Sequence, residues 1–282
     1  MSGLARERKV LSRQHFSLTT GAVLVGLVVL VALVSFLWTP YDPLKVDASA
    51  RLLGPGGEHL FGTDKFGRDV ASQLMVGART TLYVGVVAVG VAALVGTPLG
   101  MLAGMSKRWL GEFVMRVNDL VLAFPALLLA IMFGAVFGAS TLTAMVAIGI
   151  ATVPSFARIA RSGTLQVMST EYVLAARSAG RSRFFIARRH VLPNISGLVI
   201  VQSSVSFAIA VLSEAALSFL GFGTRPPTPS WGRMLQESQE LLTVQPRLAL
   251  VPGIAIAIAV LGFNLLGDGL RDRFDPRLEV RR

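Results

Sequence analysis

The chain has 282 residues, of which 53% are hydrophobic and 15% are charged. An ordinary soluble domain carries about 25% charged residues, so this composition excludes a soluble globular protein and indicates a membrane protein. The chain contains no cysteine, which excludes disulfides, thiolate metal sites and cysteine nucleophiles. Its net charge of +11 is compatible with nucleic-acid binding only if the positive charges gather on one surface.

Six apolar stretches approach or exceed the roughly 20 residues needed to cross a bilayer. They cover residues 18–38, 79–104, 119–138, 141–160, 196–220 and 247–267. The first stretch is longer than the core of a secretion signal, and no small-residue cleavage site follows it, so we expect a retained helix. The basic residues 1–17 before it are expected to form a flexible tail. The sequence therefore predicts an all-α membrane protein with six transmembrane helices.

Basic residues are distributed unevenly between the segments that connect the predicted spans. With the N-terminus inside, most of the 27 lysines and arginines fall in the inner segments. The outer segments hold nearly equal numbers of basic and acidic residues. Because basic residues near span ends remain in the cytoplasm, both termini are predicted to be cytoplasmic. Topology thus accounts for the positive charge, and we expect no nucleic-acid partner.

Two segments are predicted to lie outside. Residues 39–78 form a long loop before the second span. In residues 224–245, three closely spaced prolines predict a rigid turn, and Trp231 is expected at the membrane interface. A short helix lying along the membrane is then predicted from one mostly apolar face, made by Met234, Leu235, Ser238, Leu241 and Leu242.

The inner segment between the fourth and fifth spans contains a predicted helix over residues 171–180. Ser169 or Thr170 can cap its N-terminus, and Glu171 suits its first turn. Gly180 can adopt the left-handed conformation that ends a helix. Helical spacing gives this helix one face with a single aromatic and otherwise small side chains, made by Tyr172, Ala175, Ala176 and Ala179. Such a face can approach another surface closely.

A second short helix is predicted directly after Gly180. Ser182 can cap it, Arg183 and Phe184 lie in its first turn, and Pro193 is expected to end it before the fifth span begins. Two interpretations of the helix pair remain open from the residues alone. It either docks onto another subunit or lies on the anionic inner leaflet of the membrane.

Three polar residues within or beside the spans are candidate functional residues. Glu214 lies in the fifth span, where it either lines a translocation path or hydrogen-bonds to a neighbouring span. Asn264 and Asp268 lie at the inner end of the last span, with Arg271 one helical turn beyond. These residues form either a gate contact or a static cap and ion pair at the membrane surface.

Catalytic and cofactor sites are not indicated by the sequence. The three histidines are scattered, and no spacing of histidine and carboxylate residues predicts a metal site. No Walker A motif is present, so the chain is not expected to bind or hydrolyse ATP alone. We therefore expect no catalytic residue, no metal site and no bound cofactor.

Three stretches resemble one family of membrane transporters. Leu174-Ala175-Ala176, Gly180 and Leu192-Pro193 match the spacing of the "EAA" loop of ATP-binding-cassette (ABC) importer permeases. Leu174 stands where that motif has glutamate, and His190 stands where it has isoleucine. The segment from His59 to Leu82 is similar to the outer segment of the C-type permease subunits of dipeptide, oligopeptide and nickel importers. Segments of the same subunits near the C-terminus resemble residues 213–221, 226–232 and 263–272.

This resemblance implies the six-helix, type I ABC importer (MetI-like) permease fold, with a core domain at 79–267, a cytoplasmic coupling loop at 161–195 and a cytoplasmic tail at 268–282. It implies a second, similar permease, two nucleotide-binding subunits that hold ATP and Mg²⁺, and an external binding protein. It also implies coupling contacts to the nucleotide-binding subunit, made by Glu171, Tyr172, Ala175, Ala176, Gly180, Arg183, Phe184 and Pro193. A di- or oligopeptide is the expected substrate. The alternatives are a nickel-chelate importer and, from another class, an ion-coupled secondary transporter.

Overall fold

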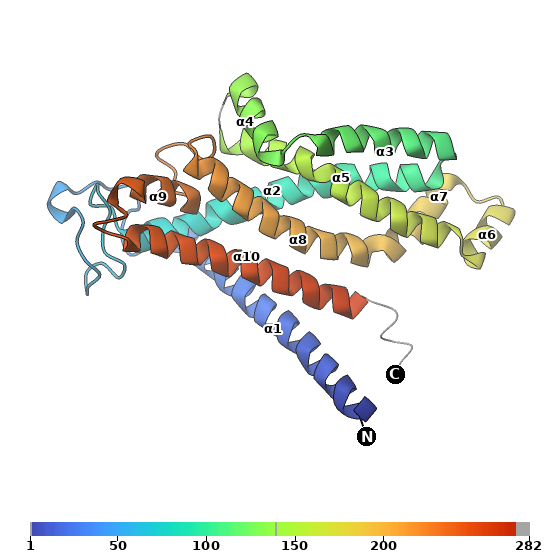
Figure 1. Ribbon diagram of the computed structural model, residues 1–282, viewed down its shortest axis with the longest axis horizontal. Helices are drawn as coiled ribbons and strands as arrows, with labels where there is room; N and C mark the ends of the chain where they lie inside the picture. The colour runs from blue at the N-terminus through green and yellow to red at the C-terminus, as the bar shows by residue number, and fades with distance from the viewer. Residues whose placement is uncertain (1, 139, 275–282) are drawn as a thin grey trace.

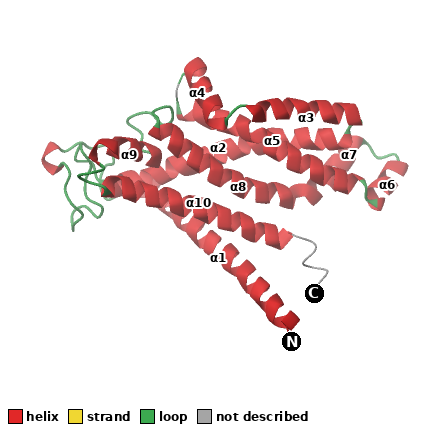
Figure 2. Ribbon diagram, viewed as in Figure 1, coloured by secondary structure: helices red, strands yellow, loops and turns green. Residues whose placement is uncertain are grey.

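The computed structural model describes residues 2–138 and 140–274, and within these residues the regular structure is entirely helical. Figures 1 and 2 show an elongated bundle of long helices with short helices and loops at both ends. The elements are α1 (Ser2–Leu37), η1 (Ala48–Ala50), α2 (Val70–Met105), α3 (Arg108–Ala123), α4 (Ala126–Phe137), α5 (Thr141–Met168), α6 (Glu171–Ser178), α7 (Arg183–Ile186), η2 (Ala187–Val191), α8 (Leu192–Phe219), α9 (Trp231–Ser238), η3 (Gln239–Leu241) and α10 (Arg247–Phe274).

The two ends of the bundle carry different structures. The α9 end holds the segment between α1 and α2 together with α9, and the α6 end holds α6 and α7 (Figure 1). The start of α1 and the last turns of α10 also point toward the α6 end (Figure 1). Within the residues that the structure describes, five helices are long and apolar enough to cross a membrane, and the number rises to six if the bent pair α3 and α4 counts as one span.

The centre of the bundle is the pair α2 and α5, which pack closely along their length. Small residues make this approach possible. A Cβ on Gly96 would lie 2.5 Å from the carbonyl oxygen of Val153, and a Cβ on Gly100 would lie 2.3 Å from that of Ala157. Because these contacts are with backbone atoms, a larger residue cannot be accommodated by moving a side chain. The pair therefore forms a rigid centre on which α8 packs.

The third predicted span, 119–138, is not one continuous helix. The chain bends by 82° between α3 and α4. Phe124 is extended, with φ −86° and ψ 126°, because the following Pro125 disfavours helical geometry in the residue before it. In Figure 1, α3 runs beside α5, whereas α4 turns away from the bundle axis. The predicted span is therefore a bent pair of helices, because its apolar residues lie on both sides of a proline.

Other helix boundaries also differ from the predicted spans. Helix α1 begins at Ser2, so residues predicted as a flexible tail are helical, since they include good helix formers that extend the apolar helix. Helix α2 begins at Val70, which shortens the outer loop predicted at 39–78. Helix α10 continues to Phe274, so the whole described part of the predicted tail, residues 268–274, is helical. Residues 275–282 of that tail lie outside the described residues.

Candidate functional site

The loop helix α6 ends in the way that the sequence predicts. Gly180 has a φ of +72°, the left-handed conformation. Its N–H donates to the carbonyl oxygen of Arg177 at 2.9 Å, and the N–H of Arg181 donates to that of Ala176 at 3.1 Å. These bonds satisfy the last carbonyls of the helix. No atom lies within 4 Å of a Cβ built on Gly180, so the constraint there is the backbone conformation alone.

The start of α6 differs from the prediction of a side-chain cap. Thr170 occupies the cap position, but its side chain makes no capping hydrogen bond. Its hydroxyl instead donates to the carbonyl oxygen of Val167 at 2.6 Å. The Ser169 hydroxyl likewise donates to the carbonyl oxygen of Gln166 at 2.8 Å. Both hydroxyls therefore satisfy the last turn of α5, and Glu171 remains as the favourable charge in the first turn of α6.

The face of α6 that is buried is not the face of small side chains that the sequence predicts. Val173, which the sequence did not single out, is fully buried in a cluster at the α6 end of α5 and α8. Ala176 is half-buried against the same cluster. Tyr172 and Ala175 are exposed, and Leu174, which stands at the glutamate position of the EAA motif, is 50% exposed. The helix therefore docks on its own chain through Val173 and presents its other face outward.

The second short helix joins directly to the following span. The hydroxyl of Ser182 accepts a hydrogen bond from the N–H of Phe185 at 3.2 Å, as the predicted cap requires. Helix α7 then passes through the π-helical turn η2 into α8 without a break. Pro193 lies in the first turn of α8, directly after the π-helical turn, so it does not end the preceding helix as predicted. Phe184 is 75% exposed, and Arg183 beside it is also exposed.

An aromatic contact joins α6 to the π-helical turn. The ring of His190 lies 5.7 Å from that of Tyr172 and 5.8 Å from that of Phe185. The guanidinium of Arg181 lies 4.9 Å from the centre of the Phe185 ring. His190 occupies the isoleucine position of the EAA motif. This departure from the motif places a polar ring between Tyr172 of α6 and Phe185 of α7.

Glu214 is buried in the wall of the bundle. It is 1% exposed and accepts hydrogen bonds from the hydroxyls of Ser218, at 2.6 Å, and Thr224, at 3.1 Å. The N–H of Thr224 donates to the Ser218 hydroxyl at 2.9 Å. The partners therefore come from the same helix and the loop after it, not from a neighbouring span. Because no face of Glu214 is open, this arrangement favours a structural role over the lining of a path.

The candidate residues of the last span, Asn264 and Asp268, lie on the side of α10 that does not pack against other helices. Asn264 and Asp268 are both exposed, and within residues 140–274 no ion pair joins Asp268 to Arg271. The predicted static ion pair is therefore not formed in this structure. A gate role for Asn264 and Asp268 remains a prediction.

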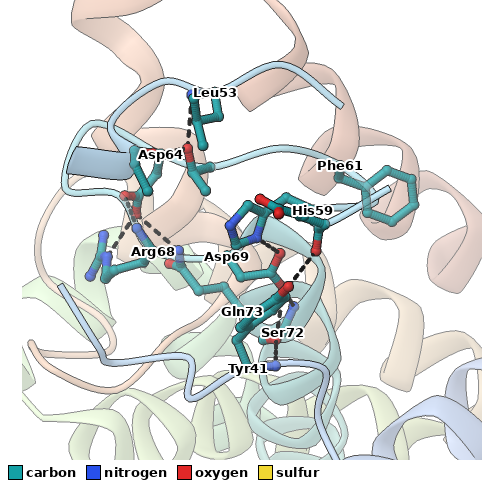
Figure 3. Close-up of polar contacts among 12 residues, drawn as sticks. Tyr41, Leu53, His59, Phe61, Asp64, Arg68, Asp69, Ser72 and Gln73 are labelled. Atoms are coloured by element: carbon teal, nitrogen blue, oxygen red, sulfur yellow. Dashed lines mark hydrogen bonds and ion pairs between the residues drawn. The ribbon is translucent and has the colours of Figure 1, made fainter. Parts of the chain in front are cut away.

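The segment between α1 and α2 is an ordered structure at the α9 end (Figure 3). Asp69 caps α2 by accepting from the N–H of Ser72 at 2.7 Å, and its other oxygen lies 2.9 Å from Nδ1 of His59. Asp64 accepts from Nε of Arg68 at 2.7 Å and from Nε2 of Gln73 at 2.9 Å. The sequence analysis did not pair His59 with Asp69, because a separation of ten residues between a histidine and a carboxylate carries no recognisable pattern.

The same segment is tied to α9 and α10. Arg68 also pairs with Glu237 of α9, and Nζ of Lys65 lies 3.0 Å from Oε2 of Glu240. Trp231 was expected at the membrane interface, but it is 3% exposed, and its Nε1 donates to the carbonyl oxygen of Leu74 at 2.9 Å. The indole ring packs within the protein, where Gly77 leaves room for it on α2, and its level relative to the membrane interface stays a prediction.

Asp47, at the start of the short helix η1, is an exposed titratable group of this segment. Hydrogen bonds from the Ser49 side chain and from the Ser49 N–H hold the pKa of the Asp47 carboxyl below its usual value. The contribution of this cap to stability is therefore present above the pKa of an unfolded aspartate and is lost as the pH falls through the lowered value.

Comparisons with known proteins bear on the whole chain. The family described as "Binding-protein-dependent transport system inner membrane component" matches residues 96–280. The dipeptide transport system permease protein of Alkalihalophilus pseudofirmus is 41% identical over 259 residues, covering 92% of this chain and 85% of the relative. The glutathione transport system permease protein of Pectobacterium atrosepticum is 38% identical over 268 residues, covering 95% of this chain and 89% of the relative.

The fold is also found in a solved transporter. A chain of the MetNI methionine ABC transporter, in an inward-facing conformation, superimposes with a TM-score of 0.61 at 17% identity, covering 72% of this chain and 96% of that chain. The permease fold that the EAA resemblance implies is thereby confirmed. The chain therefore belongs to the family of binding-protein-dependent transport system inner membrane components and is an integral membrane permease subunit of an ABC importer.

Proposed function

We propose that this permease carries small peptides inward. Permeases of this family work with separate ATPase and substrate-binding proteins. Two relatives with about 40% identity along most of the chain are described as dipeptide and glutathione permeases, and both substrates are short peptides. We further propose that the chain pairs with a second, similar permease, which together with two ATPase subunits and a binding protein completes the importer.

The α6 loop is the proposed contact with the ATPase subunit. The observation that supports it is the combination of the left-handed Gly180 with the exposed side chains of Tyr172 and Phe184 at one extremity of the bundle. Exposed aromatic side chains are typical anchors of protein interfaces. Nucleotide and Mg²⁺ are proposed to bind to the ATPase subunits alone, and this chain is proposed to be non-catalytic, since its sequence carries no phosphate-binding motif.

The α6 end is proposed to face the cytoplasm, with both termini on that side. Exposed arginines gather there, including Arg177, Arg181, Arg183 and Arg189. Such an excess of basic residues beside span ends is typical of the cytoplasmic side. The α9 end then faces outward, where the binding protein delivers substrate.

In the proposed mechanism, closure of the ATPase subunits moves α6. Val173 and the contact of Tyr172 with His190 connect α6 to the turn η2, and this turn continues into α8. Movement of α6 therefore tilts α8 and switches the bundle between states open to the two sides of the membrane.

Reconstitution tests the proposal. The complete transporter, purified through a tag on this chain, is placed in liposomes with its binding protein and radiolabelled alanyl-alanine. We expect uptake that requires ATP and both partner types. Uptake by this chain alone, driven by a proton gradient, would instead identify a secondary transporter. ATP-driven uptake of a nickel chelate but not of the peptide would replace the proposed substrate.

A further inference from the structure

An ion pair joins α3 and α5 well away from the α6 end of both helices. Nη2 of Arg158 lies 2.7 Å from Oδ1 of Asp119, and the two side chains are 55% and 49% exposed. Both residues lie about ten residues from the α6 end of their helices, which corresponds to roughly 15 Å at 1.5 Å per residue. This is about half the thickness of the hydrocarbon core of a bilayer.

Apolar side chains on α3 support a position within the membrane. The exposed side of the helix carries an apolar stripe made by Trp109, Phe113, Val117 and Leu120, which are 68%, 61%, 46% and 67% exposed. Tryptophan is enriched at the membrane interface, and Asp119 lies ten residues beyond Trp109 along the helix. Phe124, beyond Asp119, is again apolar and 53% exposed. Charged groups at such a depth face water or protein, since hydrocarbon disfavours them strongly.

A polar strip extends from this ion pair to the α6 end. Beside the apolar stripe, α3 carries a polar stripe at helical spacing, made by the exposed residues Glu112, Arg116 and Asp119. The open face of α5 continues it with the half-buried Ser155 and the exposed Arg158, Ser162 and Gln166. Helices α3 and α5 pack against each other, and the Arg158 to Asp119 bond joins their polar residues into one strip.

The charges of this strip favour a water-filled path over a buried protein interface. The centre of a protein interface is depleted of charged residues, whereas the strip holds Glu112, Arg116, Asp119 and Arg158. Arg108, one turn before Glu112, pairs with it at 2.8 Å, so basic side chains outnumber acidic ones on this surface. A surface that carries both signs with a basic excess can bind a solute that carries both signs, and it does not attract a simple cation.

From these observations we infer that the joined polar strip of α3 and α5 lines the α6 half of the translocation path, and that Arg158 and Asp119 bind the carboxylate and ammonium groups of a zwitterionic peptide as it passes. This inference rests on the proposed peptide import and names the residues that the substrate contacts. It places the path on α3 and α5, away from the buried Glu214.

Cysteine labelling tests the water-filled path directly, because the natural chain has no cysteine. Single cysteines are placed at two matched depths, with Ser162→Cys and Ser155→Cys on the polar strip and Phe113→Cys and Leu120→Cys on the apolar stripe. Inside-out vesicles holding the full transporter are treated with a charged, membrane-impermeant thiol reagent. We expect the strip cysteines to react at least about tenfold faster, since thiolates form in water and not in hydrocarbon. Equal or reversed rates would overturn the inference.

Charge removal tests the contact with substrate. In the reconstituted transporter, Arg158→Gln and Asp119→Asn are expected to lower ATP-driven uptake of alanyl-alanine by roughly tenfold, the effect of losing one charged hydrogen bond. The unfolding temperature of the complex should not change, because an exposed ion pair contributes little to stability. Lys65→Gln, which breaks the ion pair with Glu240 at the α9 end, is the matched control and should transport like the wild type.

The outcomes separate this inference from the proposed function. Wild-type uptake of alanyl-alanine with unchanged uptake by both charge variants overturns the substrate contact and leaves peptide import standing. A fall in unfolding temperature that parallels the loss of uptake shows that the ion pair only holds α3 to α5, and also overturns it. Absence of ATP-driven alanyl-alanine uptake by the wild type overturns both.

Discussion

Nη1 of Arg247 donates a 2.6 Å hydrogen bond to the carbonyl oxygen of Phe61, a residue 186 positions earlier in the chain. The other terminal nitrogen, Nη2, donates to the carbonyl oxygens of Leu53, at 2.6 Å, and Thr63, at 3.2 Å. One side chain in the first turn of α10 therefore satisfies three carbonyls of the segment between α1 and α2. This segment has no regular ladder of backbone hydrogen bonds. The side chain of Arg247 instead supplies donors to three of its carbonyls.

Replacing Arg247 by methionine is expected to loosen the segment between α1 and α2. The three carbonyl oxygens lose their donor, and the expected cost is about 1–3 kcal/mol for partners left unsatisfied. Thermal unfolding of the purified transporter and limited proteolysis within residues 39–69 measure the effect. Arg225→Met is the matched control, because Arg225 is exposed and its side chain makes no hydrogen bond or ion pair to residues 2–138 or 140–274. Equal protease resistance of the two variants would contradict the role of Arg247.

Replacing Gly180 by valine is expected to uncouple ATP hydrolysis from transport. The left-handed conformation at φ +72° costs a side-chain-bearing residue roughly 1–2 kcal/mol, and the cost is highest for a β-branched residue. The end of α6 should then shift while substrate delivery persists. ATP hydrolysis and alanyl-alanine uptake are measured on the same liposomes. Gly180→Asn is the control, because asparagine tolerates this conformation, and similar coupling ratios in both variants would refute the prediction.

Truncating Phe184 to alanine is expected to weaken binding of the ATPase subunits without destabilising the permease. The ring is 75% exposed and contributes little to the packing of this chain. As an interface anchor it should contribute about 2 kcal/mol to binding. The amount of ATPase subunit retained with the tagged permease after washing reports the effect. Leu30→Ala removes a similarly exposed apolar side chain from α1, and it should leave retention unchanged.

Two glycines of α2 provide a matched test of helix packing. A Cβ on Gly100 would lie 2.3 Å from the carbonyl oxygen of Ala157, whereas no atom lies within 4 Å of a Cβ on Gly90. Gly100→Ala should therefore destabilise the permease by about 1–3 kcal/mol through forced separation of α2 and α5. Gly90→Ala should be neutral or stabilising by up to ~1 kcal/mol, since alanine favours the helix. Unfolding temperatures in detergent give the comparison, and equal values would contradict it.

The sequence predicted the parts of the fold that depend on local chemistry. Apolar stretches identified the long helices because hydrocarbon requires about 20 apolar residues to be crossed. The end of α6 was predicted from Gly180 and the cap of α7 from Ser182, since each depends on one residue and its immediate neighbours. The EAA spacing identified the family because it is a local pattern as well.

The remaining features depend on contacts between distant residues. His59 meets Asp69 and Trp231 meets Leu74 only after the chain has folded, so neither pair has a spacing that a sequence reveals. Arg158 likewise meets Asp119, which lies 39 residues earlier on another helix, only in the folded chain. Charged residues within predicted spans are rare, so the two residues were nevertheless a usable signal.

The break between α3 and α4 has a consequence for how the protein is made in the cell. At Phe124 and Pro125, extended backbone lies on an exposed side of the bundle, where the regular hydrogen bonds of a helix are interrupted. The N–H of Phe124 still donates to Val121, and the carbonyl of Pro125 accepts from Leu129, but the N-terminus of α4 has no side-chain cap. N–H groups without a cap are not stable against lipid tails and must be covered by protein or water. A newly inserted copy that has found no partner should therefore be recognised by membrane quality-control proteases. Pulse-chase experiments should show a shorter lifetime for this subunit when it is synthesised alone than when it is synthesised with the other components of the importer.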